Sequence, residues 1–463
     1  MRARSPHLVL VAAASAVLAT LSFVPAAPGS AAAVVGDPRN VDVDVRSGGA
    51  PAFTVTWAPP TAGSPTSYEV VVDGSVRATV DGATRRATVE GLEVGGTYGI
   101  AVRSVDAGGE RSDGVNRRAI LTYGAASPRL AANPTNPLAG REWGVHLGRS
   151  EPAYEPWLKA RGATKDAIGR ITLQPKAKWF GSWIPDGDAQ RKVAQYLDES
   201  TRGDRAVLSQ MTLYRAAPWG AATHTRKPTA AEWASYQRYV NGVAAAIGDR
   251  PMAVVLQPDG AWMQGAPRGP RSIYAMVRWS ANRLSALPNT AVYLEIGSPD
   301  WLRFDPARAV RLLRSVGIAK ARGFALSVTH MDSTESSVRY GARVVDALAK
   351  VGIADKHFVV DTSDNGRGFT VADFRKVYPA SVPIGAAKMC RTATQRLCVA
   401  LGIPPTTDVA NPRWGLPADV NALAAKHVDA YLWIDRPWLR WQIAPFVVRD
   451  AVALAAWNPF AQT

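Results

Sequence analysis

Short apolar segments alternate with segments of helical periodicity along residues 136–463, and this alternation constrains the fold more than any other feature of the chain. The strand candidates are rich in Val, Leu and Ile and occupy residues 206–211, 253–257, 291–296, 323–329, 357–362 and 430–434. Helical patterns lie between them at residues 230–247, 273–287, 306–316 and 338–351. Strands that are each followed by a helix are typical of a parallel sheet with both faces covered. We therefore predict an α/β domain, a parallel (β/α) barrel rather than an open sheet.

Carboxyl groups recur where the predicted strands end. Asp259, Glu295, Asp361 and Asp435 each lie at such an end, and active sites of parallel barrels form at the carboxyl edge of the sheet. A single strand-end aspartate often caps the next helix instead, but recurrence over several strands favours a catalytic site. Because Pro258 restricts the backbone before it, we expect the Asp259 carboxyl to point into a cleft. Paired carboxyls in a chain with 15 Trp suit the cleavage of glycosidic bonds between stacked sugars.

A smaller module precedes the barrel. Residues 37–124 alternate polar and apolar residues over short segments that are separated by turns, and Asp73-Gly74 predicts a hairpin. This pattern predicts an all-β sandwich. Trp57, Tyr68 and the segment 91–98 make the module similar to a fibronectin type III domain, in which we expect Trp57 and Tyr98 to lie in the core. Residues 125–135, rich in Pro, Ala and Asn, indicate a linker to the domain at 136–463.

The first 33 residues have the composition of a secretory signal peptide. Arg2 and Arg4 precede an apolar run, and Ala31-Ala32-Ala33 provides a small-residue cleavage site. We therefore expect a secreted, extracellular protein with no membrane association after cleavage.

Composition excludes several functions. The formal net charge of +16 is spread along the chain without clustered aromatic platforms, which argues against nucleic-acid binding. With 6 scattered His and 2 Cys, a metal site is not expected. We expect no cofactor, a monomeric state and a polysaccharide or oligosaccharide as the partner.

The larger domain resembles the family-6 glycoside hydrolases, secreted cellulases that cleave β-1,4-glucan with inversion. The resemblance is carried in order by the segments 174–183, 256–259, 287–294, 322–326, 361–366, 401–406 and 428–433. It implies a distorted parallel barrel and assigns the general acid to Asp259. It further implies sugar contacts for aromatic and amide side chains, namely Trp179, Trp183, Trp301, Asn365 and Trp433. We also expect a sugar contact for Trp438, which lies where the sequence departs from the family.

The sequence departs from that family at several catalytic positions. Segment 214–219 lacks the aspartate that supports the acid, Gln257 replaces a Glu, and Glu295 replaces an Asp. Segment 434–441 lacks the family's Lys, Glu and proposed base. Two hypotheses therefore stay open. In the first, the domain is a glucanase, inverting by resemblance, in which Asp259 is the acid and Asp435 or Glu295 holds or activates water. In the second, it is a catalytically impaired glycan-binding protein that keeps a Trp-lined cleft.

The two cysteines also differ from the family pattern. Cys390 matches a family cysteine, whereas Cys398 lies eight residues further along the chain. In a secreted protein these two residues could close a local disulfide.

Overall fold

The structure is a computed structural model. It describes residues 35–46, 52–92, 97–121, 136–148, 150–216, 227–260, 271–382, 384, 387–437 and 445–460. The predicted signal peptide at 1–33, the central linker at 125–135 and Trp438 lie outside these residues.

The N-terminal module is a sandwich of two antiparallel sheets. One sheet has the order β1-β2-β5, formed by Arg39–Val45, Phe53–Ala58 and Arg86–Val89. The other has the order β4-β3-β6-β7, formed by Ser75–Asp81, Ser67–Val72, Thr97–Val105 and Val115–Ile120. Trp57 and Tyr68 pack at 5.4 Å between ring centroids in the core, and Tyr98 packs edge-on against Phe53 at 6.0 Å. The core position expected for Trp57 is therefore confirmed, whereas Tyr98 is partly buried and packs against the core.

The larger domain is built on one parallel sheet of seven strands in the order β14-β13-β12-β11-β10-β9-β8. From β8 to β14 the strands are Lys178–Gly181, Ser209–Tyr214, Met252–Leu256, Thr290–Glu295, Gly323–Leu326, His357–Asp361 and Val428–Leu432. Each of the six predicted strands overlaps an observed one, and the predicted parallel barrel is confirmed. Strand β8 was not predicted, because four residues that include Lys178 and Gly181 give no apolar run.

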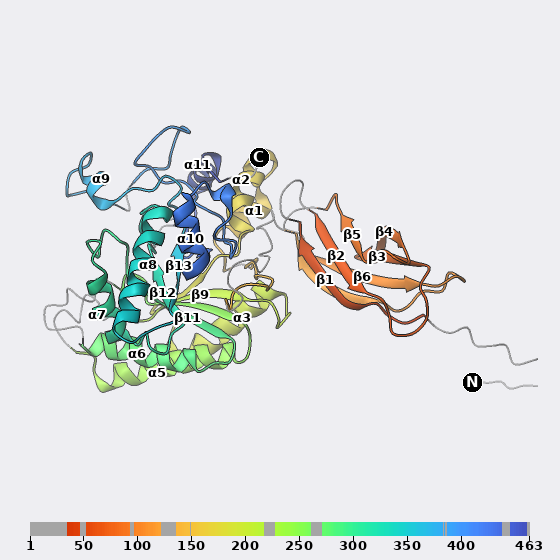
Figure 1. Ribbon diagram of the computed structural model, residues 1–463, viewed down its shortest axis with the longest axis horizontal. Coiled ribbons are helices and arrows are strands. Elements are labelled where there is room, and N and C mark those ends of the chain that lie inside the picture. Colours follow the sequence, from red (N-terminus) through yellow and green to blue (C-terminus); the bar gives the residue numbers. More distant parts are fainter. Residues whose placement is uncertain are drawn as a thin grey trace, which may run out of the picture.

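Helices cover the outer face of this sheet (Figure 1). In chain order, the α-helices are α1 Tyr154–Lys159, α2 Gly162–Thr172, α3 Ala189–Thr201, α5 Ala230–Ile247, α6 Arg271–Ser285, α7 Pro306–Val316, α8 Thr334–Lys350, α9 Val371–Arg375, α10 Ala418–His427 and α11 Val448–Ala456. Helices α5 and α7 have the predicted bounds because their starts are strongly specified. Thr229 and Glu232 form a capping box before α5, and Asp305 caps α7, which begins with Pro306.

The sheet curls until its two edges meet at one place. Lys176, just before β8, forms a bridge with Trp433, just after β14, and the Ala177 N–H donates to the Trp433 carbonyl at 2.9 Å. The Trp179 indole N–H donates to the Ile434 carbonyl at 2.6 Å. Since β8 and β14 share no further pairing within the described residues, the barrel is distorted and open along the rest of this seam.

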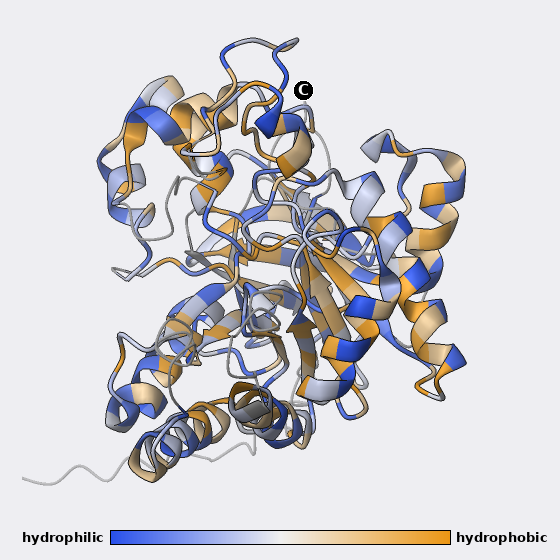
Figure 2. Cartoon of the chain, turned by 90° about the vertical axis from the view of Figure 1, so that its left-hand side faces the viewer, coloured by the Kyte–Doolittle hydropathy of each residue, from blue (hydrophilic) through white to orange (hydrophobic). Residues whose placement is uncertain are grey.

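Strand residues alternate between two apolar cores. Inside the curl lie Ala253, Val255, Tyr293, Ala325, Val359 and Ala430, whereas the helices pack on Val254, Leu256, Leu294, Phe324 and Val360. Figure 2 shows the hydrophobic strands at the centre and polar residues on the outer surfaces of the helices. Within the described residues, every helix is too short or too polar to cross a bilayer.

The Cys390–Cys398 disulfide is confirmed, with an S–S distance of 2.03 Å. Both cysteines are buried, and the bridge between Met389 and Val399 pairs the two flanking segments. The disulfide therefore closes a short loop between α9 and α10.

Candidate active site

Strained backbone marks the carboxyl edge of the sheet beside Asp259. Gln257 and Asp259, after β10, have φ of 58° and 58°, and Ser327 and Thr329, after β12, have φ of 65° and 67°. Such left-handed conformations are unfavourable for residues with a side chain and cluster at functional sites. The Thr329 hydroxyl donates to Asp259 Oδ1 at 2.8 Å, so these two turns meet at the predicted acid.

Glu295, at the end of β11, holds the turn that carries Asp259. Its carboxyl is 2% exposed and accepts backbone N–H groups of Gly260 at 2.8 Å and of Gly297 at 2.6 Å. Burial, and then the nearby charge of Asp259, raise the pKa of Glu295 well above its ordinary value. Because both oxygens accept from the backbone, the geometry favours a positioning role for Glu295 over activation of water.

Strand β9 contributes Tyr214 to the same region. Burial, with the charges of Asp259 and Glu295, raises the pKa of the Tyr214 hydroxyl. Gln257 is buried, and its side-chain oxygen accepts the Ala216 N–H at 3.1 Å, which ties the segment after β9 to β10. The described residues 214–216 carry no carboxyl group, in agreement with the departure seen in the sequence.

A second group of carboxyls lies at the ends of β13 and β14. Asp361 accepts N–H groups of Ser363 at 2.9 Å, Ile434 at 3.2 Å and Asp435 at 2.8 Å. Asp361 therefore fixes the turn that carries Asp435.

Burial raises the pKa of each carboxyl in this second group. The pKa of Asp361 rises to about 6, and that of Asp364 lies well above its ordinary value. Burial, followed by the charge of Asp361, raises the pKa of Asp435 to about 7, and Asp259 adds to this effect. A carboxyl with a pKa near 7 is suited to accept a proton at neutral pH.

The predicted tryptophans have different environments. Trp183 is 57% exposed, whereas Trp179 is 5% exposed. The Trp179 ring packs edge-on against Tyr214 at 5.5 Å, and the Arg436 guanidinium lies 5.2 Å from its centroid. Trp301 is partly exposed and stacks on His330 at 4.8 Å. Among the tryptophans of this set that the structure describes, Trp183 and Trp301 therefore offer accessible rings.

Two expected sugar contacts do not agree with the structure. Trp433 is 1% exposed, packs in the cluster formed with α2 and α11, and donates its indole N–H to the Ile403 carbonyl at 2.9 Å. The alternation of side chains along β14 turns this ring away from the inside of the barrel. Asn365 is 4% exposed and donates its amide to the Asp332 carbonyl at 3.0 Å. Both side chains are therefore buried away from a position where they could contact sugar.

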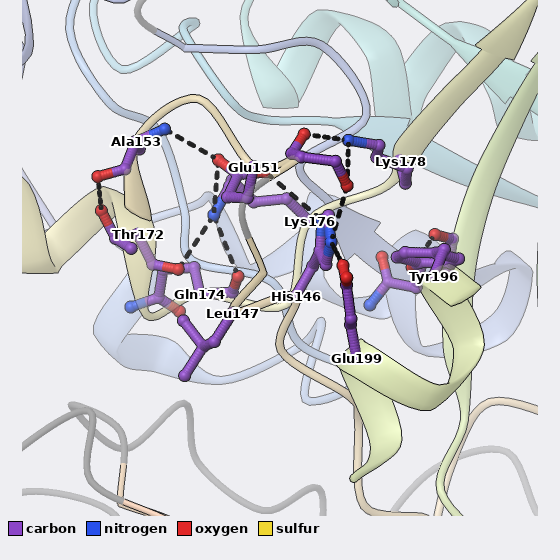
Figure 3. A network of polar contacts seen from close by, with 12 residues as sticks. His146, Leu147, Glu151, Ala153, Thr172, Gln174, Lys176, Lys178, Tyr196 and Glu199 are labelled. Carbon is purple, nitrogen blue, oxygen red and sulfur yellow. Dashed lines mark hydrogen bonds and ion pairs between the residues drawn. The ribbon is translucent and has the colours of Figure 1, made fainter. Parts of the chain in front are cut away.

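A buried ionic network lies next to the start of β8 (Figure 3). His146 lies 2.7 Å from Glu199 and 3.7 Å from Glu151, and the Lys176 ammonium lies 3.9 Å from Glu151. Lys176 also donates to the carbonyls of Ile171 and Thr172 at the end of α2. Burial opposes the charge on Glu151, but Lys176 and His146 outweigh it and lower the pKa of Glu151 to about 2. Lys176 is thereby fixed where it bridges to Trp433 and closes the barrel.

Sequence reasoning did not select Tyr214, Thr329, His330 or Asp332 as site residues. The motifs that carried the resemblance do not include them, and only their position after predicted strands could have indicated them. No group of His, Cys, Asp and Glu in the described part of the chain has the arrangement of a metal site.

The described residues thus form a parallel barrel with buried carboxyls and accessible tryptophans at its carboxyl edge, an arrangement compatible with a glycoside hydrolase. The chain belongs to the glycosyl hydrolases family 6, whose family model matches residues 149–439. The fibronectin type III model matches residues 36–117.

Curated relatives are endoglucanases. The chain is 31% identical over 225 residues to endoglucanase A of Cellulomonas fimi, covering 49% of this chain and 47% of that protein. It is 31% identical over 259 residues to endoglucanase 1 of Streptomyces halstedii, covering 54% of this chain and 76% of that protein. The chain thus spans about half the length of the first of these relatives.

Solved structures share the fold. The endoglucanase Cel6 of Mycobacterium tuberculosis superposes with a TM-score of 0.52 at 24% identity, over 70% of this chain and 99% of that one. A family-6 enzyme of Orpinomyces sp. Y102 gives 0.51 at 19% identity, over 70% and 98%.

The buried carboxyls predict an unusual dependence of stability on pH. The folded pKa values of Asp361, Asp364, Asp435 and Glu295 are raised, so between about pH 4 and 7 the folded state holds protons that the unfolded chain has lost. Stability should therefore fall as pH rises through this window. We expect thermal unfolding at a higher temperature at pH 5 than at pH 8, and Asp364→Asn should raise the unfolding temperature at pH 8 but not at pH 4.5. Equal effects of Asp364→Asn at both values would contradict this explanation.

Proposed function

We propose that the protein is a secreted glucanase that hydrolyses β-1,4-linked glucan with inversion. The observation that supports this most strongly is the position of Asp259 on a strained turn that Thr329 and Glu295 hold in place. The names of the curated relatives, both endoglucanases, support β-glucan as the substrate class.

Asp259 is proposed as the general acid. The Thr329 hydroxyl donates to Oδ1, which leaves Oδ2 to carry the proton. As the glycosidic bond breaks, this proton passes to the leaving oxygen, and Asp259 becomes ionised. Glu295 acts on the reaction by positioning Asp259 through the Gly260 N–H.

Asp435 is proposed as the base. Its Oδ1 accepts the Arg436 N–H at 2.8 Å, and Asp361 holds its backbone. Asp435 would take a proton from a water molecule whose oxygen attacks the anomeric carbon on the face opposite the leaving group. An inverting pair requires a separation of about 6.5–9.5 Å, which leaves room for that water.

A glycan-binding role is the second candidate. It is favoured by the neutral Gln257 and by the absence of a carboxyl at the described positions 214–216. The family-6 pattern has acidic groups at both of these places. Such a protein would bind the oligosaccharide without cleaving it.

The configuration of the first product tests the proposal. We expect proton NMR during hydrolysis of cellohexaose to show the α-anomer at the new reducing end before mutarotation. Appearance of the β-anomer first would contradict inversion. Binding of cellohexaose by calorimetry with no product would favour the glycan-binding role.

A further inference from the structure

Two stacked rings lie beside the proposed acid. The Trp301 ring, from the loop after β11, stacks on the His330 ring, from the loop after β12, with centroids 4.8 Å apart and 29° between planes. Both side chains are partly exposed. Since His330 follows Thr329, whose hydroxyl donates to Asp259, these rings form a platform next to the reacting bond.

An acidic pair lies directly behind this platform. Asp300 precedes Trp301, and Asp332 comes two residues after His330. The Asp300 N–H donates to Asp332 Oδ2 at 3.3 Å, which places the two carboxyls near each other. Asp332 is 1% exposed. The loops after β11 and β12 are therefore joined through the Asp332 carboxyl.

Further hydrogen bonds fix each member of the pair. The Val371 N–H donates to Asp300 Oδ2 at 2.7 Å, and the Ser298 hydroxyl donates to Asp300 Oδ1. The Trp301 N–H in turn donates to the Ser298 hydroxyl oxygen at 3.4 Å. Asp332 Oδ1 is buried with no hydrogen-bond partner in the described part of the chain. Asp300 is thus arranged as the ionised acceptor. Asp332 is the member of the pair that has one oxygen, Oδ1, without a hydrogen-bond donor in the described part of the chain.

Two carboxyls in contact share one proton, because two negative charges at this separation repel strongly. Burial, and then the charge of Asp300, raise the pKa of Asp332 to about 8. Burial acts against ionisation of Asp300, but its hydrogen bond with Asp332 lowers its pKa. Titratable or charged groups on the described elements around the pair include Asp361 at the end of β13, His330, Asp364 and Arg367 on loops, Glu335 on α8, which pairs with Arg339, and Asp373 on α9, which pairs with Lys376.

We propose that Asp300 and Asp332 form a proton-sharing pair that positions the Trp301–His330 platform to bind a sugar beside Asp259. This inference rests on the proposed glucanase function. Both residues act through the platform and are positioning residues. Loss of the shared proton would make the carboxyls repel each other, separate the two loops and weaken binding of the sugar.

The test compares variants that remove one carboxyl of the pair with one that replaces a carboxyl by a neutral group of the same size. Asp332→Asn keeps a neutral group beside Asp300 that cannot ionise, whereas Asp332→Ala removes the acceptor of the Asp300 N–H and Asp300→Ala removes the other carboxyl of the pair. Asp346→Asn, on the exposed side of α8, is the matched control. KM and kcat are measured for cellopentaose from pH 5 to pH 9.

We expect KM of the wild type to rise above pH 8 and that of Asp332→Asn to stay level, with KM at pH 6 within about twofold of the wild type. The two alanine variants should raise KM by about tenfold at pH 6 and change kcat less, since a lost platform contact corresponds to about one factor of ten in binding. The control should match the wild type throughout.

Different results would overturn the two proposals. Unchanged KM in both alanine variants, or a rise of KM above pH 8 in Asp332→Asn equal to that of the wild type, would refute the role of the pair. If the alanine variants do not fold, as judged by circular dichroism, the pH profile of Asp332→Asn decides alone. If the wild type neither hydrolyses nor binds cellopentaose, this result would instead refute the glucanase function on which the role rests.

Discussion

Replacing Asp259 with Asn should lower kcat/KM on cello-oligosaccharides by about 10²–10⁴-fold, because the amide cannot give a proton to the leaving oxygen. Asparagine keeps the size of the side chain and can still accept from the Thr329 hydroxyl. The fold and the binding of substrate should therefore persist. Initial rates of oligosaccharide cleavage, with binding followed by calorimetry, measure the two effects separately.

The leaving group provides the control for this assignment. A substrate with a good leaving group, such as 2,4-dinitrophenyl β-cellobioside, needs little protonation, so Asp259→Asn should cleave it at nearly the rate of the wild type. Asp346→Asn removes an exposed carboxyl and should change neither rate. A loss of the same size on both substrates would show that Asp259 is not the acid.

Replacing Asp435 with Asn should lower kcat/KM by about 10²–10⁴-fold as well, but equally for good and poor leaving groups. The reason is that activation of water does not depend on the group that departs. In the wild type, Asp435 must be ionised to accept a proton, and its pKa is raised to about 7. Activity should therefore decline as pH falls below about 7, and the residual activity of Asp435→Asn should lack this decline.

Azide distinguishes loss of the base from damage to the site. This small anion needs no deprotonation, so it should restore cleavage of the dinitrophenyl substrate by Asp435→Asn. It should not restore cleavage of cellopentaose by Asp259→Asn. Rates measured with and without azide decide the matter. Full activity of Asp435→Asn without azide would show that another group serves as the base.

Much of the fold could be predicted because local signals agree with the tertiary structure. Helices α5 and α7 have strong caps at Thr229 and Asp305, and their bounds match the prediction. Strand β8 was not predicted because its four residues give no apolar run, and it is held by pairing with β9, a distant part of the chain. Long-range support of this kind leaves no periodic pattern in the sequence.

The site could be predicted only in part. Strand ends correctly brought Asp259 and Glu295 together, since the Gly260 N–H joins their positions. The direction of a side chain was harder to predict. Trp433 lies close in sequence to the cleft residue Asp435, yet its ring faces the helices. The Asp300–Asp332 contact depends on two loops meeting in space, which no spacing within either loop indicates.

The release of reducing ends from barley β-glucan, carboxymethylcellulose and cello-oligosaccharides tests the central claim most directly. Wild-type protein, Asp259→Ala and Asp346→Asn are compared at the same concentration near pH 7. The proposed function predicts steady release by the wild type and by Asp346→Asn, and loss of release in Asp259→Ala with oligosaccharide binding retained. Binding without release by the wild type would contradict it.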